Sequence, residues 1–109
     1  ISVSKAVIEV GVNTGQDTFI EEKGIDVVTY MHCDAQGNDI NVLKSFGKHI
    51  DKLSAGVVEA AKDEFLYTYK ENSQENVIAF LEENGFTVTE LRDNDETGLE
   101  VNIHFERAK

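Results

Sequence analysis

The chain has 109 residues, of which 40% are hydrophobic and 28% are charged, and its formal charge is −11. This length suits one domain that buries about two thirds of its unfolded surface, so the chain needs neither a disulfide nor a metal to fold. The regular spacing of Val, Ile, Leu and Phe excludes a disordered class, and no apolar run approaches the ~20 residues of a membrane span.

The first third of the chain indicates β-structure. Apolar residues alternate over residues 6–12, and residues 25–31 are rich in β-branched side chains. These two patterns predict two strands. Residues 13–24 leave two interpretations open, a hairpin turn at residues 13–15 or a helical turn near residues 17–23.

The middle of the chain predicts a turn followed by a long helix. Residues 34–37 fit a three-residue hairpin loop, which favours a short third strand beginning at residue 38 over a helix capped by Asp39. Residues 42–64 then carry apolar side chains at helical spacing, at Leu43, Phe46, Ile50, Leu53, Val57 and Ala60. Residues 65–69 fit either the end of this helix or an extra strand.

The last third of the chain has the clearest signals for where helices and strands begin and end. Ser73 is a good helix N-cap, Glu75 suits the positive end of the helix dipole, and Gly85 suits the left-handed position after a helix. Residues 86–92 and 99–107 then predict an antiparallel hairpin, because apolar and polar residues alternate strictly in the second segment. The polar residues 93–98 form its turn.

Together these elements predict one compact domain over residues 1–109. The expected fold class is α+β, with two layers, an antiparallel sheet of four to five strands and two helices, in the order ββ(β)ααββ.

The residues with reactive side chains do not form a catalytic or metal-binding motif. Cys33 follows His32 in a predicted strand, so the two side chains point to opposite faces, and we expect a small buried hydrophobe. His32, His49 and His104 match no short metal-ligand spacing. Residues 93–98 begin like a calcium loop, but position twelve is His104 where an EF-hand has glutamate. We therefore predict no metal, no cofactor and no catalytic residues.

Positive charge is sparse in this chain. Lys44, Lys48 and Lys52 recur every four residues of the predicted long helix. This stripe suits either an anionic partner or a solvent-facing helix surface, and we favour the solvent-facing surface.

Negative charge is concentrated toward the C-terminus, where residues 71–109 hold ten acidic and three basic residues. Such a surface repels phosphate, so we predict no nucleic-acid binding. We expect a cytoplasmic domain that makes no membrane contact and is non-enzymatic, acting by protein–protein interaction or self-association. Its binding surface would be the acidic hairpin at Asp93, Asp95 and Glu96, or an open sheet edge.

Two other function classes compete with this hypothesis. A small-molecule or metal-ion binding domain would place a helix–sheet pocket at Tyr30, His32, His49 and Tyr67. Acidic mimicry of nucleic acid would require rows of carboxylates at phosphate spacing.

Overall fold

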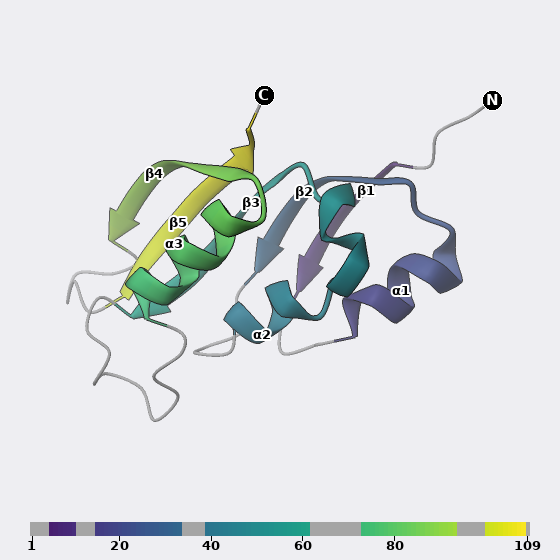
Figure 1. Cartoon of the computed structure of the whole chain (residues 1–109), viewed down its shortest axis with the longest axis horizontal. Coiled ribbons are helices and arrows are strands. Elements are labelled where there is room, and N and C mark those ends of the chain that lie inside the picture. The colour runs from purple at the N-terminus through teal and green to yellow at the C-terminus, as the bar shows by residue number, and fades with distance from the viewer. Residues whose placement is uncertain (1–4, 11–14, 34–38, 62–72, 94–99, 109) are drawn as a thin grey trace.

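The computed structural model describes residues 5–10, 15–33, 39–61, 73–93 and 100–108. Within these residues the fold class is α+β, with four helical segments and one sheet (Figure 1). In chain order the elements are β1 (Lys5–Val10), α1 (Gln16–Lys23), β2 (Val27–Cys33), α2 (Asp39–Lys44), the 3₁₀ helix η1 (Gly47–Lys52), β3 (Ala55–Ala61), α3 (Gln74–Glu83), β4 (Phe86–Asp93) and β5 (Glu100–Arg107).

The sheet is mixed, and its strand order is β1-β2-β3-β5-β4. β1, β2 and β3 are parallel, whereas β5 pairs antiparallel with both β3 and β4. The prediction of an antiparallel sheet is therefore correct for the β3–β5 and β4–β5 pairings and wrong for the β1–β2 and β2–β3 pairings. Helical crossovers between strands of the same direction are almost always right-handed, which brings successive helices to one face of the sheet. Figure 1 shows the helices in one layer in front of the sheet, as the predicted two-layer arrangement requires.

The predicted long helix over residues 42–64 is wrong. α2 ends at Lys44, η1 follows, and residues 55–61 form the central strand β3. Gly47 has φ 53°, which ends the right-handed helical path. β3 lies between β2 and β5 and is buried over most of its length, so it lacks the alternation by which a half-buried strand is recognised. Gly56 is required there, because a Cβ would overlap the backbone oxygen of Met31.

The short third strand that we expected from residue 38 is also absent from the described residues, since α2 begins at Asp39. The Asp39 side chain is buried, and its Oδ2 accepts a hydrogen bond of 3.0 Å from the backbone N–H of Glu59. β2 pairs with β3 only at Met31–Gly56 and His32–Val57. The carboxylate therefore binds β3 beyond the last residue that pairs with β2.

The other helix predictions are confirmed. α1 runs from Gln16 to Lys23 and is followed by its C-cap Gly24, which has φ 62°, so the helical interpretation of residues 17–23 is correct. α3 begins after Ser73, whose Oγ accepts a hydrogen bond of 3.3 Å from the Asn76 backbone N–H. Gly85 follows α3 with φ 85°. Residues 65–69 lie outside the described residues. No described helix is long and apolar enough to span a bilayer.

The core fills the space between the helices and one face of the sheet. Fully buried side chains come from β2, α2, β3, α3 and β5, among them Val28, Met31, Leu43, Val58, Leu81 and Ile103. At the end of β5, Phe105 packs edge-to-face on Phe86 of β4 with ring centroids 5.1 Å apart.

Arg107, the last residue of β5, joins three segments. Its guanidinium lies 4.0 Å over the Phe86 ring and donates to the backbone oxygens of Ile50, Leu53 and Asn84. These contacts tie η1 and the end of α3 to the start of β4. Burial lowers the pKa of Arg107 from its ordinary value.

Candidate functional site

The outer edge of β4 carries the longest run of exposed residues in the sheet, among the strand residues whose burial is described. β4 is the last strand in the order and pairs there with β5 alone. Residues 89–93 are all exposed, whereas Phe86 at the start of the strand is buried. The backbone N–H and C=O groups on this outer edge form no part of the sheet ladder, so the edge offers a place for another strand.

A bulge divides β4 into two parts. The pairing with β5 passes from Val88–Phe105 to Glu90–His104, which leaves Thr89 as the extra residue. Beyond the bulge, Leu91 is registered with buried Ile103, so it lies on the side of the helices. Glu90 and Arg92 lie on the opposite side, because side chains alternate along a strand.

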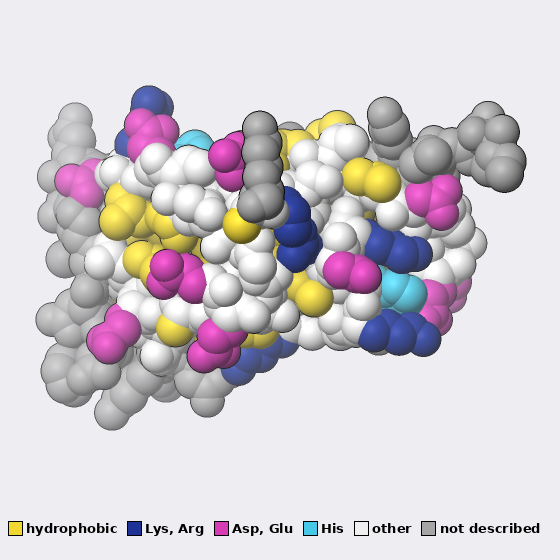
Figure 2. Space-filling model, turned by 45° about the horizontal axis from the view of Figure 1, so that its top comes forward, with side chains coloured by type: hydrophobic (Ala, Val, Ile, Leu, Met, Phe, Trp, Pro, Cys, Tyr) yellow, Lys and Arg dark blue, Asp and Glu magenta, His cyan; other side chains and the backbone are white. Residues whose placement is uncertain are grey.

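Leu91 is one of three large hydrophobic side chains that are exposed within the described ranges. Its exposed fraction is 47%, compared with 71% for Val7 and 39% for Tyr30. The two neighbouring residues are charged, and Arg92 Nε lies 3.0 Å from Glu90 Oε1 with both side chains open to solvent. In Figure 2 basic and acidic side chains lie together at the upper left, where Figure 1 places β4.

One of the three residues of the predicted acidic hairpin lies on this edge. Asp93 is the last residue of β4 and is exposed. Asp95 and Glu96 lie outside the described residues, as does most of the loop that resembles the start of a calcium site.

The four predicted pocket residues are not brought together where the structure describes them. Tyr30 and His32 are exposed on β2, on the face of the sheet away from the buried side chains Met31 and Cys33. His49 lies on η1 and contacts α1, and Tyr67 lies outside the described residues.

The histidines likewise form no shared site. His32 is registered with Val57, which is registered with His104, so the two histidines stand two strands apart, or roughly 10 Å. Across the described part of the chain no group of three His, Cys, Asp or Glu residues is placed to hold a metal ion. Cys33 is a free thiol with 1% exposure, in agreement with its predicted role as a small buried hydrophobe.

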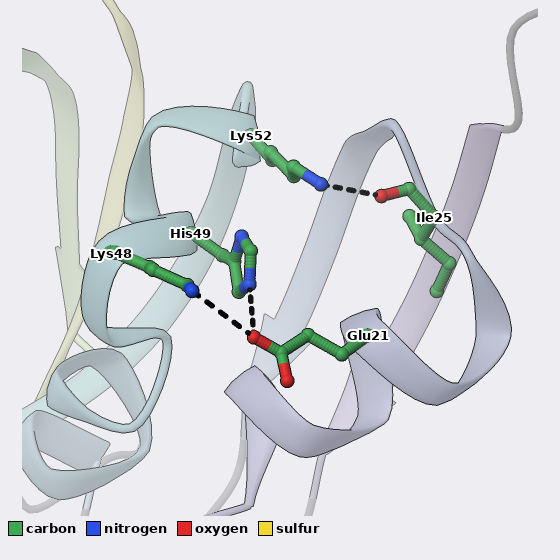
Figure 3. Close-up of polar contacts among 5 residues, drawn as sticks. All are labelled: Glu21, Ile25, Lys48, His49 and Lys52. Atoms are coloured by element: carbon green, nitrogen blue, oxygen red, sulfur yellow. Dashed lines mark hydrogen bonds and ion pairs between the residues drawn. The ribbon is translucent and has the colours of Figure 1, made fainter.

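A polar cluster joins α1 to η1 (Figure 3). Glu21 Oε1 lies 2.9 Å from His49 Nε2 and 3.5 Å from Lys48 Nζ. The hydrogen bond with His49 and the charge of Lys48 lower the pKa of the Glu21 carboxyl from its ordinary value of 4.5. The nearby Lys52 Nζ donates to the backbone oxygen of Ile25 at 3.1 Å. Figure 2 shows these side-chain types gathered at the right end of the molecule.

This cluster changes the interpretation of the lysine stripe. The stripe was expected on one face of a long helix, but Lys44 ends α2 while Lys48 and Lys52 belong to η1. Lys48 and Lys52 contact α1 and the segment that follows it. Lys52 therefore joins η1 to the segment after α1, whereas Lys48 is 78% exposed, as expected for a solvent-facing side chain, and its surface ion pair contributes little.

One hollow lies on the helix layer, between α2 and α3. Its volume is about 280 Å³. The residues that line it are Ile40, Lys44, Asn76, Ala79, Phe80 and Glu83. None of the predicted pocket residues is among them.

Comparison with known proteins returns no match: no family, no curated protein and no solved structure is significantly similar to this chain. The function must therefore be argued from the geometry alone. Sequence reasoning predicted β4 and an open edge but did not single out Glu90, Leu91 and Arg92. The available signal was an apolar residue between opposite charges, late in a predicted strand.

Proposed function

We propose that this protein is a non-enzymatic interaction domain that binds another polypeptide chain by strand addition at the outer edge of β4. The observation that carries the proposal is the run of five exposed residues from the bulge to the end of this edge strand. An added strand would pair with the backbone along this outer edge, which supplies affinity without requiring a deep pocket.

The side chains of this segment supply selectivity. Because side chains alternate along a strand, an incoming chain meets Leu91 on the helix side and Glu90 and Arg92 on the other side. A suitable partner therefore presents an apolar side chain flanked by charges. The charge of −11 disfavours binding to nucleic acid.

The acidic hairpin extends the same surface in this proposal. Asp93 is exposed at the end of β4, and Asp95 and Glu96 follow it in the sequence. These carboxylates would attract basic side chains of the partner. We place the interaction in the cytoplasm, where the lone thiol of Cys33 stays reduced.

Site-specific photocrosslinking tests this proposal. A photoreactive amino acid replaces Leu91 in one variant, Val7 on the opposite edge strand in a second, and exposed Glu22 on α1 in a third. Irradiation of cells that express each variant should give a discrete polypeptide adduct from position 91, and mass spectrometry identifies the captured chain. No adduct at position 91, or the same adducts from all three positions, would refute binding at β4.

A further inference from the structure

We propose that the chain that pairs with β4 is a second copy of the same protein, related by a two-fold axis through Leu91. The inference rests on the proposed strand addition at β4 and names the partner. It follows from the order of side chains on the exposed edge, which is complementary to itself.

Antiparallel pairing of two identical strands about one residue places equal numbers of residues on either side of that residue. About Leu91, Glu90 lies opposite Arg92 of the second copy, and Arg92 lies opposite Glu90 of the second copy. The two opposite-charge pairs lie on the same side of the joined sheet, and each is of a kind that stabilises antiparallel sheets. The half-exposed Leu91 side chains meet on the other side of the sheet.

Neighbouring registers lose this match. A two-fold axis through Glu90 sets the two glutamates opposite each other. It also places Arg92 opposite Val88 of the second copy, beside the bulge. An axis through Arg92 sets two arginines opposite each other and Leu91 opposite Asp93. Like charges directly opposite each other are destabilising. The register about Leu91 is therefore favoured over the two adjacent registers, which also place the helix layers of both copies on the same side of the sheet.

The same geometry orients the two copies. Residues opposite each other in a sheet point to one side, and Leu91 lies on the helix side in each copy. The dimer is then one continuous sheet with both helix layers on the same face. A five-residue edge covers less than the roughly 800 Å² per partner of a standard interface, and the charge of −11 on each copy opposes association. The dimer is therefore weak, with a dissociation constant of roughly 10–100 µM.

Charge exchange tests the register. Sedimentation velocity of the purified full chain, from roughly 10 µM to 1 mM in about 150 mM salt, should show a reversible monomer–dimer equilibrium. Glu90→Arg and Arg92→Glu each create like-charge pairs across the axis and should weaken dimerisation about tenfold or more. The double variant E90R/R92E restores both opposite-charge pairs and should return the dissociation constant to within about threefold of the original. Thermal unfolding of each variant confirms that the fold is intact.

Disulfide trapping tests the position of the axis independently. Residues that lie directly opposite each other in antiparallel strands have Cα atoms about 4.5–5.5 Å apart, which is within the range of a disulfide. Leu91→Cys should therefore form a covalent dimer on mild oxidation. Val7→Cys, on the other edge of the sheet, is the matched control and should remain monomeric, and Cys33 is too buried to contribute.

Each result decides for or against the inference. A wild-type protein that is monomeric at about 1 mM overturns it, as does a double variant that stays as weak as the single variants, or equal trapping through Val7→Cys and Leu91→Cys. If the pure protein is monomeric while the photoreactive group at position 91 captures a different polypeptide in cells, the second copy is wrong and strand addition at β4 stands. If position 91 captures nothing, both proposals fail.

Discussion

Arg107 offers the sharpest test of how the fold supports the β4 edge. We predict that Arg107→Met, which retains much of the apolar stem and removes the guanidinium, lowers the free energy of unfolding by about 2–4 kcal/mol. The guanidinium donates to three backbone oxygens, of Ile50, Leu53 and Asn84, and covers the Phe86 ring. The predicted loss follows from removing these contacts.

The magnitude follows from the partial exposure of the site. Hydrogen bonds from a charged donor contribute about 1.5–3 kcal/mol each when isolated, but three that share one side chain do not add fully. The cation–π contact contributes about 0.5–2 kcal/mol. Burial lowers the pKa of Arg107, which shows that desolvation of the guanidinium opposes part of this gain.

Urea denaturation followed by circular dichroism measures the loss, and the midpoint of thermal unfolding should fall by roughly 10–20 °C. Arg92→Met is the matched control, because the Arg92 side chain is 69% exposed and its contact is with Glu90 on the same strand, so its loss should stay within about 0.5 kcal/mol. Arg107→Lys keeps the charge but loses the planar set of guanidinium donors. Its loss in the free energy of unfolding should therefore lie between those of Arg107→Met and Arg92→Met. A loss below about 1 kcal/mol for Arg107→Met would refute the role assigned to the guanidinium.

Three further predictions concern other parts of the fold. Gly56→Ala should cost about 2–4 kcal/mol in urea denaturation, since the new methyl group overlaps the Met31 backbone oxygen, and a cost near zero would contradict this close approach of β2 and β3. Ser73→Ala should cost about 1 kcal/mol through loss of the α3 cap, with Ser73→Asn close to the original protein; equal losses in the two variants would exclude a capping role. The pKa of Glu21 is lowered in the folded protein, so its contacts stabilise the fold above the ordinary value of 4.5 and are lost as the pH falls below it. The original protein should therefore lose more stability than Glu21→Gln between roughly pH 5 and pH 3, and parallel urea midpoints across this range would contradict the contact with His49.

The C-terminal third was predictable because its signals are local. Ser73 and Gly85 mark the two ends of α3 within the sequence itself, and β5 alternates because one of its faces is buried and the other is not. The hairpin partner follows directly after the helix, so little chain separates the strands that pair. Each of these features is set by residues close together in the chain.

The middle of the chain was not predictable by the same means. β3 has strands on both sides, and its small residues, including Gly56 and Ala60, are selected by packing against strands far away in the sequence. The apolar residues of β3 also recur at the spacing of one helix face, and for this reason the sequence predicted a helix there. Strand direction and order also depend on crossovers that span the domain, so the sequence did not show that β4 lies at an edge.

The bulge at Thr89 separates the part of β4 that packs in the core from the part to which we assign strand addition. Before the bulge, β4 is held by Phe86, which packs against Phe105 and under Arg107. After the bulge, Glu90 and Arg92 face solvent and Leu91 is half exposed. Substitutions in the second part should therefore change the free energy of unfolding by about 0.5 kcal/mol or less. A change in self-association caused by exchanging Glu90 and Arg92 then reports on pairing at the edge and not on loss of the folded state.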